Sequence, residues 1–466
     1  MRYVSTRGEA PVLGFDDVLL SGLARDGGLY VPEAWPKFSA AEWRGLAGLS
    51  YAGAALRVLK PFVGDAISER DLAELLDDSY KAFGHPATAP LKQIGANDWL
   101  LELFHGPTLA FKDYALQVVG RLFDHVLAKR RSRVTIVGAT SGDTGSAAIE
   151  ACRGRSAIEI FILHPKGRVS EVQRRQMTTV AAQNVHNIAV EGTFDDCQDL
   201  VKALFNDAAF RDRVNLSAVN SINWARIAAQ IVYYAVAAVA LGAPARPVAF
   251  SVPTGNFGNI FAAYAAARMG LPIRHLVIGS NSNDILCRLL ETGTMKMEGV
   301  TPTLSPSMDI QVSSNLERLL FELAGRNGKS VADMMRRFRK RGEMKLSPAR
   351  HGKLRRFFSG ARADDEQTLA VMRAHYAATG ELIDPHTAVG LAAAAAQRGD
   401  AAVPMVTVAT AHPAKFPDAV QKATGVRPGL PPRLADLLQR PERVAVLPND
   451  ARQLQEFILE HVQVPA

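Results

Sequence analysis

The fold is decided by one stretch, Val134-Thr-Ile-Val-Gly-Ala-Thr-Ser-Gly-Asp-Thr-Gly-Ser-Ala-Ala148. Its apolar start predicts a buried strand over 134–137 and its end a helix over 146–151, with a short polar loop between them. Gly142 and Gly145 let backbone amides approach a ligand closely, and amides at the start of a helix favour an anion. The glycine spacing fits neither the dinucleotide fingerprint nor a Walker-type loop. Taken by itself, the stretch is also compatible with an ordinary strand-to-helix turn.

A second stretch of the same kind lies further along the chain, Val248-Ala-Phe-Ser-Val-Pro-Thr-Gly-Asn-Phe-Gly-Asn259. A predicted strand again runs into a small loop, and an apolar helix is predicted over 260–267. We expect the loop amides to cradle a phosphate monoester and the side chain of Asn259 to cap the helix. A plain turn is an equal alternative for this stretch alone, but its repetition of the first pattern favours a ligand site.

Upstream of both loops, one lysine stands in His105-Gly-Pro-Thr-Leu-Ala-Phe-Lys-Asp-Tyr114. Apolar residues at helical spacing follow over 114–126, so Lys112 is predicted to open a helix. The positive end of a helix dipole disfavours the ammonium form of such a lysine. A neutral amine is what Schiff-base chemistry with an aldehyde cofactor needs. A surface lysine at a helix start is the alternative interpretation.

Strand-like and helix-like segments alternate along most of the chain. Helical stretches separate the predicted strands, which cover 134–137, 158–163, 185–190, 248–252, 275–279 and 403–409. This alternation predicts an α/β fold with open, mostly parallel sheets and helices on both faces. Ligands in such sheets bind beyond the carboxyl ends of the strands, where both glycine loops stand.

Composition is that of a well-packed globular protein, with 466 residues of which 48% are hydrophobic and 21% charged. Two or three domains are expected at this length. Three widely spaced cysteines without ligand spacing predict neither a disulfide framework nor a metal site, so a cytoplasmic location is expected. The N-terminus has no apolar signal region. The uncharged run 227–245 is predicted to be a buried helix and not a membrane span, because Gly242 and Pro244 break it.

Most of the net charge of +8 lies in the segment 336–356, which holds ten Lys or Arg and one acidic residue. The pattern predicts two helices broken at Gly342. A solvated helical face is the default interpretation, and steering of an anionic substrate is a second one. Nucleic-acid binding would also need a recognisable binding fold, which the sequence lacks. We therefore expect no nucleic-acid partner.

Together, these motifs resemble the threonine synthases, a family of pyridoxal-phosphate enzymes related to the tryptophan synthase β-subunit. The resemblance rests on Phe-Lys-Asp around Lys112, on Ser-Gly-Asp-Thr-Gly-Ser-Ala at 141–147 and on Gly-Asn-Phe-Gly-Asn at 255–259. It spans 1–425, and further agreement is found at 15–32, 221–227, 384–388 and 410–416. The resemblance implies a tryptophan synthase β-like fold, the cofactor pyridoxal 5'-phosphate, and conversion of O-phospho-L-homoserine and water to L-threonine and phosphate.

The same resemblance implies how the chain is divided. We expect an N-terminal unit over 1–95, a large cofactor-binding domain formed by 96–130 and 196–425, a smaller mobile domain over 131–195, and a C-terminal tail with a closing helix over 426–466. A monomer or weak homodimer is expected, although the sequence itself defines neither the oligomeric state nor an effector.

Roles for the cofactor residues follow from the resemblance and from what an aldehyde cofactor requires. Lys112 is expected to form the Schiff base and to remove the α-proton of the substrate. Thr410, at the end of a predicted strand, is expected to bond the pyridine nitrogen. Asp143 is a candidate neighbour of the phenolic oxygen, or it faces elsewhere. The cofactor phosphate is expected on Gly255, Asn256, Phe257, Gly258 and Asn259.

The substrate carries two anionic groups. Its α-carboxylate suits the hydroxyls and amides of Thr140, Ser141 and Thr144 at a helix start. Its phosphate needs a cation, and Arg226 is expected to supply it because a guanidinium binds phosphate bidentately. Lys415 and His412 are further candidates for that cation.

Two other functions stay open. The first is a related pyridoxal-phosphate lyase or dehydratase, which the sequence allows because the substrate can shift within the fold class. The second is a non-catalytic phosphate-ligand binder of the same fold. Retention of Lys112 counts against the binder, because a binder would not need the amine.

Overall fold

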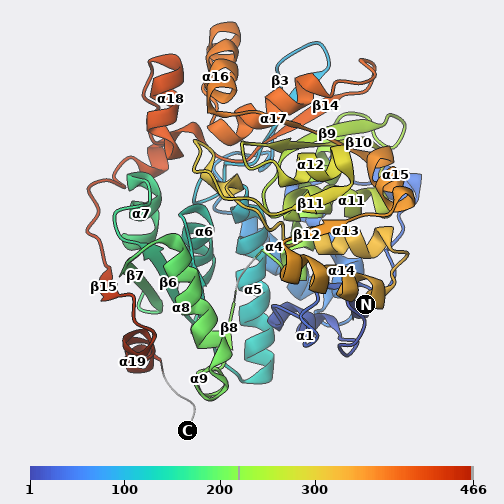
Figure 1. Ribbon diagram of the computed structural model, residues 1–466. Coiled ribbons are helices and arrows are strands. Elements are labelled where there is room, and N and C mark those ends of the chain that lie inside the picture. The colour runs from blue at the N-terminus through green and yellow to red at the C-terminus, as the bar shows by residue number, and fades with distance from the viewer. Residues whose placement is uncertain (219–220, 463–466) are drawn as a thin grey trace. The chain divides into compact units, whose positions relative to one another are not determined.

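The computed structural model describes residues 1–218 and 221–462 (Figure 1). The chain forms two compact units. The larger comprises Met1–Val18, Leu23–Ala115 and Ser221–Pro428, and the smaller comprises Leu19–Gly22, Leu116–Asn220 and Gly429–Ala466. Each unit holds one mostly or wholly parallel sheet, which confirms the predicted α/β class with two open sheets.

The larger unit is centred on a six-stranded sheet in the order β13-β10-β9-β14-β4-β3. Its neighbouring strands pair in parallel, except that β3 runs antiparallel to β4. Every residue of β9 is buried, as expected for a central parallel strand. The strands are β3 (Leu91–Gln93), β4 (Asp98–Glu102), β9 (Val248–Pro253), β10 (Ile273–Ser280), β13 (Phe358–Arg362) and β14 (Met405–Ala409).

Helices of the larger unit pack against this sheet and against one another. The predicted buried helix is α10, which ends at Ala240, earlier than the uncharged run, and its residues are almost all buried. Across the described residues, no helix combines the length and the apolar character that crossing a membrane requires. The helices are α10 (Trp224–Ala240), α11 (Gly258–Arg268), α12 (Ile285–Thr292), α13 (Leu316–Leu323), α16 (Asp365–Thr379), α17 (Pro385–Ala396) and α18 (Pro417–Thr424), with short 3-10 turns at Pro306–Met308 and Pro413–Lys415.

Most of the N-terminal segment belongs to the larger unit and does not form a unit of its own. Buried polar contacts join the N-terminal segment to α13 of the larger unit. The Nε of Arg318 donates to the carbonyl of Tyr30 at 3.0 Å, and the Thr6 hydroxyl donates to Glu317 at 2.6 Å. The segment contains β1 (Tyr3–Ser5), α1 (Phe15–Leu20), β2 (Tyr30–Pro32), α2 (Ala40–Arg44), α3 (Tyr51–Val63) and α4 (Glu69–Tyr80).

The smaller unit is built on a five-stranded parallel sheet in the order β15-β7-β6-β5-β8. It is wider than the predicted 131–195, because β15 pairs with β7, and Leu454 and Ile458 of α19 join the core of that sheet. The predicted mobility of this unit stays a prediction. Its elements are β5 (Val134–Ala139), α6 (Asp143–Cys152), β6 (Ile158–Pro165), α7 (Glu171–Thr178), β7 (Val185–Glu191), α8 (Phe194–Asn206), α9 (Ala208–Arg213), β8 (Leu216–Ser217), a 3-10 turn at Pro432–Leu434, β15 (Ala445–Pro448) and α19 (Ala451–His461).

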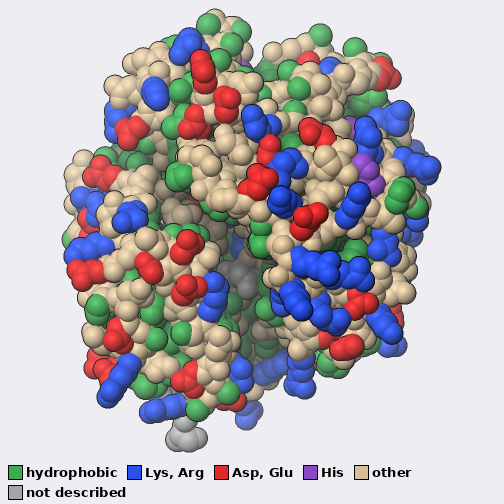
Figure 2. All heavy atoms as spheres, in the orientation of Figure 1, with side chains coloured by type: hydrophobic (Ala, Val, Ile, Leu, Met, Phe, Trp, Pro, Cys, Tyr) green, Lys and Arg blue, Asp and Glu red, His purple; other side chains and the backbone are tan. Residues whose placement is uncertain are grey.

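The basic segment folds as two helices, as predicted. α14 (Gly328–Arg341) ends at Gly342, whose φ of 68° gives the left-handed cap that favours glycine. α15 (Pro348–Phe357) follows after β12 (Glu343–Lys345), which pairs with β11 (Thr294–Lys296). Figure 2 shows Lys and Arg side chains gathered on the surface over α14. This surface is the solvated helical face that the sequence suggested.

Candidate active site

Lys112 is the first residue of α5 (Lys112–Arg130), as predicted, and the loop before it is held firmly. The Asp113 carboxylate accepts hydrogen bonds from the Thr108 amide at 2.8 Å and from the Thr108 hydroxyl at 2.7 Å. A Cβ on Gly106 would lie 2.4 Å from the Cβ of Asp113, so only glycine fits there. Leu109 has a φ of 62°, which non-glycine residues seldom adopt. The loop therefore presents Lys112 in a defined position.

Two other segments of the larger unit lie beside Lys112. The Ser307 hydroxyl is 3.5 Å from the Nζ of Lys112, and the Phe111 amide donates to the Thr410 carbonyl at 2.9 Å. The Ser307 carbonyl in turn lies so close to Gly255 that a Cβ on Gly255 would come within 2.7 Å of it. The structure therefore brings Lys112, Thr410 and the start of the glycine loop together.

The loop of Gly255, Asn256, Phe257, Gly258 and Asn259 joins β9 to α11. Asn315 anchors the loop, because its backbone amide and its side-chain Nδ2 donate to the Asn256 carbonyl at 3.1 and 3.0 Å. Phe257 has a φ of 62° and stands at the N-cap without a side-chain hydrogen bond. Among the described residues, the amides of 256–258 have no acceptor, so they remain available to an anion.

The prediction that Asn259 caps this helix is wrong. The left-handed conformation of Phe257 starts α11 one residue earlier, at Gly258, so Asn259 lies inside the first turn. Its Oδ1 accepts hydrogen bonds from the hydroxyls of Tyr233 and Tyr234 at 2.5 and 2.6 Å, whereas its Nδ2 is buried without a partner among the described residues. Burial raises the pKa of both tyrosines well above the usual value, so both are neutral donors. The orphaned Nδ2 is a donor that an anion can satisfy.

Arg226 lies in the first turn of α10 and is only 4% exposed. Its Nε and Nη1 are buried and have no hydrogen-bond partner within the described part of the chain. Burial lowers the pKa of the guanidinium to about 10. Its neighbour Ile227 packs close to Gly258 of the glycine loop, so this turn of α10 lies against that loop. A buried, uncompensated cation is costly, and it indicates an anion that the protein itself does not supply.

The other two candidates for the phosphate cation have structural contacts. Lys415 is fully buried and donates to the Thr108 carbonyl at 2.7 Å. The Nδ1 of His412 accepts from the Ala414 amide at 3.1 Å. These contacts favour Arg226 as the phosphate-binding cation.

The residues predicted to hold the substrate carboxylate lie together in the smaller unit, at the turn between β5 and α6. The Thr140 hydroxyl accepts hydrogen bonds from the amides of Gly142 and Gly145 at 3.0 and 2.9 Å, which makes the turn rigid. Ser141 is exposed and Thr144 is half-buried. Asp143 is buried, and its Oδ1 accepts from the Nε2 of Gln173 at 2.8 Å. Their functional roles stay predictions.

Sequence reasoning missed Ser307 and Asn315. Ser307 lies in the 3-10 turn Pro306–Met308 and Asn315 stands at the N-cap of α13, outside any glycine motif. Their importance depends on contacts with residues 195 and 59 positions away. The short Ser-Pro-Ser run at 305–307 was the only local signal. His386 stands in the quoted segment 384–388, but no function was assigned to it.

Gly255→Ala is expected to weaken cofactor binding by about tenfold to a hundredfold, because the new methyl group would push the loop away from the Ser307 carbonyl and disturb a charge-assisted contact. Gly258→Ala should have a smaller effect, since its nearest neighbours are side-chain atoms at 3.3 Å or more. Gly352→Ala is the matched control, because it points into open space on α15. Titration of the cofactor-free variants with cofactor measures the affinity, and equal values for Gly255→Ala and the control would show that the cradle lies elsewhere.

Comparison with known proteins shows the class of protein to which this fold belongs. Residues 85–348 match the family described as pyridoxal-phosphate-dependent enzyme, so the fold is that of this enzyme class. Residues 2–80 match the threonine synthase N terminus, and residues 387–458 match the threonine synthase C-terminal region. The chain belongs to the threonine synthase family, and its cofactor is pyridoxal phosphate.

Individual relatives are similar over their full length. The threonine synthase of Pseudomonas aeruginosa is 57% identical over 462 residues, which cover 99% of this chain and 98% of the relative. The crystal structure of pyridoxal-phosphate-bound threonine synthase from Brucella melitensis is 54% identical with a TM-score of 0.97, covering 99% of both chains. The yeast threonine synthase structure is 37% identical with a TM-score of 0.94, covering 99% of this chain and 98% of the yeast chain.

Proposed function

We propose that this enzyme converts O-phospho-L-homoserine and water to L-threonine and inorganic phosphate, the last step of threonine biosynthesis. The observation that carries the proposal is the buried guanidinium of Arg226, whose Nε and Nη1 have no partner in the described chain. The glycine loop at 255–259 supplies one anion site for the cofactor, and Arg226 supplies a cation for a second phosphate, that of the substrate.

The larger unit fits the cofactor. The acceptor-free amides of 256–258 and the orphaned Nδ2 of Asn259 would hold its phosphate. The Thr410 hydroxyl would bond the ring nitrogen, and the Lys112 amine would bind the aldehyde. When bound, the cofactor condenses with amines through its aldehyde, and its ring takes up the electron pair of a broken C–H bond.

Proton transfer falls to Lys112. With the cofactor and substrate bound, the Lys112 amine would lie beside the α-carbon of the substrate and would remove its α-proton. A β-proton and the phosphate would then be lost, a proton would be added at the γ-carbon to form the methyl group, water would add at the β-carbon, and return of a proton to the α-carbon would complete threonine. Asp113 is a poor alternative base, because Thr108 occupies both of its carboxylate oxygens.

Binding and orientation fall to the other residues. Arg226 would hold the γ-phosphate and stabilise it as it leaves, through charge-assisted hydrogen bonds. Thr140, Ser141 and Thr144 would bind the α-carboxylate at the start of α6. Asp143 is proposed as the neighbour of the phenolic oxygen, with Gln173 fixing one of its carboxylate oxygens.

The decisive assay offers the purified holoenzyme O-phospho-L-homoserine, with homoserine and serine as comparisons, and measures phosphate release and the amino-acid product. We expect threonine and phosphate in equal amounts from phosphohomoserine alone. A related lyase or dehydratase would instead release ammonia and an oxo acid. A non-catalytic binder would show no turnover and no visible-range absorbance of a lysine-bound cofactor.

We also propose that the enzyme works in the cytoplasm as a monomer or weak homodimer, without a membrane or nucleic-acid partner. All three cysteines are free and buried, and burial raises the pKa of Cys152 to about 12 and that of Cys197 and Cys287 to about 11. Protonated, inaccessible thiols suit a reducing compartment. Analytical ultracentrifugation over a range of concentrations would measure the association.

A further inference from the structure

We propose that His386, oriented by Asp384, is a positioning residue that fixes Ser307 against the amine of Lys112. This inference rests on the role proposed above for Lys112. It concerns three residues outside the glycine loops, which the structure joins to Lys112 in one chain of contacts.

The first of these contacts lies at the start of α17 (Pro385–Ala396). Asp384 is fully buried and caps this helix, and its Oδ1 lies 2.8 Å from the Nδ1 of His386. An ionised carboxylate only accepts hydrogen bonds, so Nδ1 carries the proton and donates it to Asp384. The Nε2 of the neutral ring is then an acceptor.

The second contact uses that acceptor. The Ser307 amide donates to the Nε2 of His386 at 3.3 Å, across 79 residues of sequence. The imidazole is 3% exposed, and the Phe416 ring lies against it with 4.9 Å between ring centres. With Asp384 on one nitrogen and Phe416 against the ring, the imidazole has a defined orientation. It therefore fixes the backbone of Ser307.

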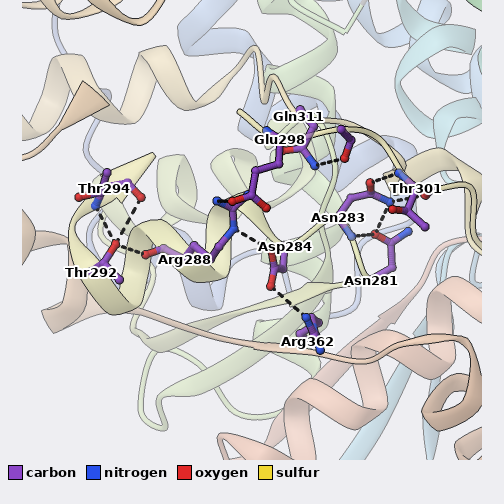
Figure 3. A network of polar contacts seen from close by, with 11 residues as sticks. Asn281, Asn283, Asp284, Arg288, Thr292, Thr294, Glu298, Thr301, Gln311 and Arg362 are labelled. Atoms are coloured by element: carbon purple, nitrogen blue, oxygen red, sulfur yellow. Dashed lines mark hydrogen bonds and ion pairs between the residues drawn. The ribbon is translucent and has the colours of Figure 1, made fainter. Parts of the chain in front are cut away.

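The stretch that carries Ser307 is anchored on both sides by a half-buried polar network. Asp309 accepts hydrogen bonds from the Nδ2 of Asn281 at 2.7 Å, from the Nδ2 of Asn283 at 3.0 Å and from the Thr303 amide at 2.9 Å. Figure 3 shows Asn283 bonded to Thr301 on the same network. The two sides of the turn at 306–308 are thus tied to the end of β10, and His386 holds the turn at its centre.

Placement of Ser307 matters for two groups at once. Its hydroxyl, 3.5 Å from Nζ, can accept from an ammonium or donate to a neutral amine, so it can direct Lys112 in either state. Its carbonyl packs directly against Gly255 at the start of the phosphate loop. A displaced Ser307 would therefore disturb both the amine and the cradle.

The test uses cofactor-free protein, so that it does not depend on which substrate the enzyme takes. Isotope-coded acetic anhydride labels the lysines, and mass spectrometry gives the acylation rate of Lys112 relative to the exposed Lys353. Titration gives the cofactor dissociation constant. The variants are His386→Leu, which deletes the acceptor, His386→Gln, whose Oε1 can replace it, and Ser307→Ala. His351→Leu is the matched control, because His351 is a half-buried histidine whose ring likewise bonds a backbone group, here the carbonyl of Leu290.

We expect His386→Leu to change the relative acylation rate of Lys112 and to weaken cofactor binding by about threefold to tenfold, the effect of one lost hydrogen bond. His386→Gln should restore most of both values, and Ser307→Ala should change the acylation rate in the same direction. The double variant His386→Leu/Ser307→Ala should be no worse than the more affected single variant, because both act through one contact.

The proposal is overturned if His386→Leu lowers only the thermal midpoint and leaves Lys112 acylation and cofactor affinity as in the His351→Leu control. It is also overturned if His386→Gln behaves like His386→Leu. Should His386→Leu fail to fold, His386→Gln and Ser307→Ala carry the same comparison. Failure of phosphohomoserine turnover in an otherwise intact enzyme would refute the proposed substrate but would not change these measurements.

Discussion

Lys112→Ala is expected to abolish turnover, by a factor of at least about 10³, because the variant loses both the attachment point of the cofactor and the base for the α-proton. The fold should survive, since the substitution leaves in place the contacts of Thr108 with Asp113 and Lys415 that hold the loop before Lys112. Steady-state kinetics measure turnover, visible absorbance measures attachment of the cofactor, and the thermal midpoint measures the stability of the fold. Lys353→Ala, on the exposed side of α15, is the control.

Direct chemical evidence comes from the unmutated protein. Borohydride reduction of the holoenzyme followed by peptide mapping should place the cofactor on Lys112. Lys415 is fully buried against Thr108, so we expect no label on it. A label on Lys415 in place of Lys112 would refute the assignment. Substantial turnover by the Lys112→Ala variant would refute it as well.

Arg226→Met is expected to leave the cofactor-free protein as stable as before, or to stabilise it by about 1–4 kcal/mol in phosphate-free buffer, because the substitution removes a buried charge that the described chain leaves uncompensated. Inorganic phosphate should raise the thermal midpoint of the unmutated protein and have little effect on the variant. Denaturant unfolding with and without phosphate measures both effects.

The second buried arginine of this region is the matched control. Arg318 is fully buried, and its pKa is lowered to about 9. Unlike Arg226, it is fully bonded: Nε donates to Tyr30 and Nη2 to Ile222, while Nη1 donates to Asn315. Arg318→Met should therefore destabilise the protein by about 3–5 kcal/mol, since it leaves these acceptors unpaired. Opposite signs for two buried arginines would separate a ligand-binding role from a structural one.

Kinetic measurements show whether Arg226 binds the phosphate of the substrate or that of the cofactor. Arg226→Lys keeps the charge but loses the planar fork, so kcat/KM for phosphohomoserine should fall by about tenfold or more. Threonine has no phosphate, and its effect on the cofactor spectrum should be nearly unchanged. If threonine binding falls as far as turnover, Arg226 serves the cofactor or the fold, and the substrate phosphate must be sought near Lys415 or His412.

Local sequence patterns predicted three adjacent strands in each of the two parallel sheets, and the two glycine loops. The predicted strand 158–163 became β6, and Lys112 opens α5 as expected, because apolar periodicity directly reflects burial on one face. Boundaries were less accurate where backbone conformation intervenes. Phe257 in the left-handed region moved the start of α11 to Gly258.

Contacts between distant segments could not be predicted in this way. β15 is four residues long and half-exposed, and it becomes a strand only because β7 offers it an edge. Ser307 lies in a single 3-10 turn and Asn315 directly before α13, and the importance of both comes from contacts with Lys112 and Asn256, far away in sequence. The place of Lys112 at the start of a helix was predictable from its own surroundings in sequence, whereas the contacts of its side chain depend on the completed fold.

The completion of the smaller unit by the end of the chain has a consequence for its synthesis. On the ribosome, β7 is complete at Glu191, but β15 begins only at Ala445. Until then, the nascent chain exposes an unpaired strand edge and the apolar surface that Leu454 and Ile458 later cover. Such surfaces associate readily with other chains. Native assembly of this unit therefore waits until β15 and α19 have been synthesised, and molecular chaperones have a long interval in which to act on it.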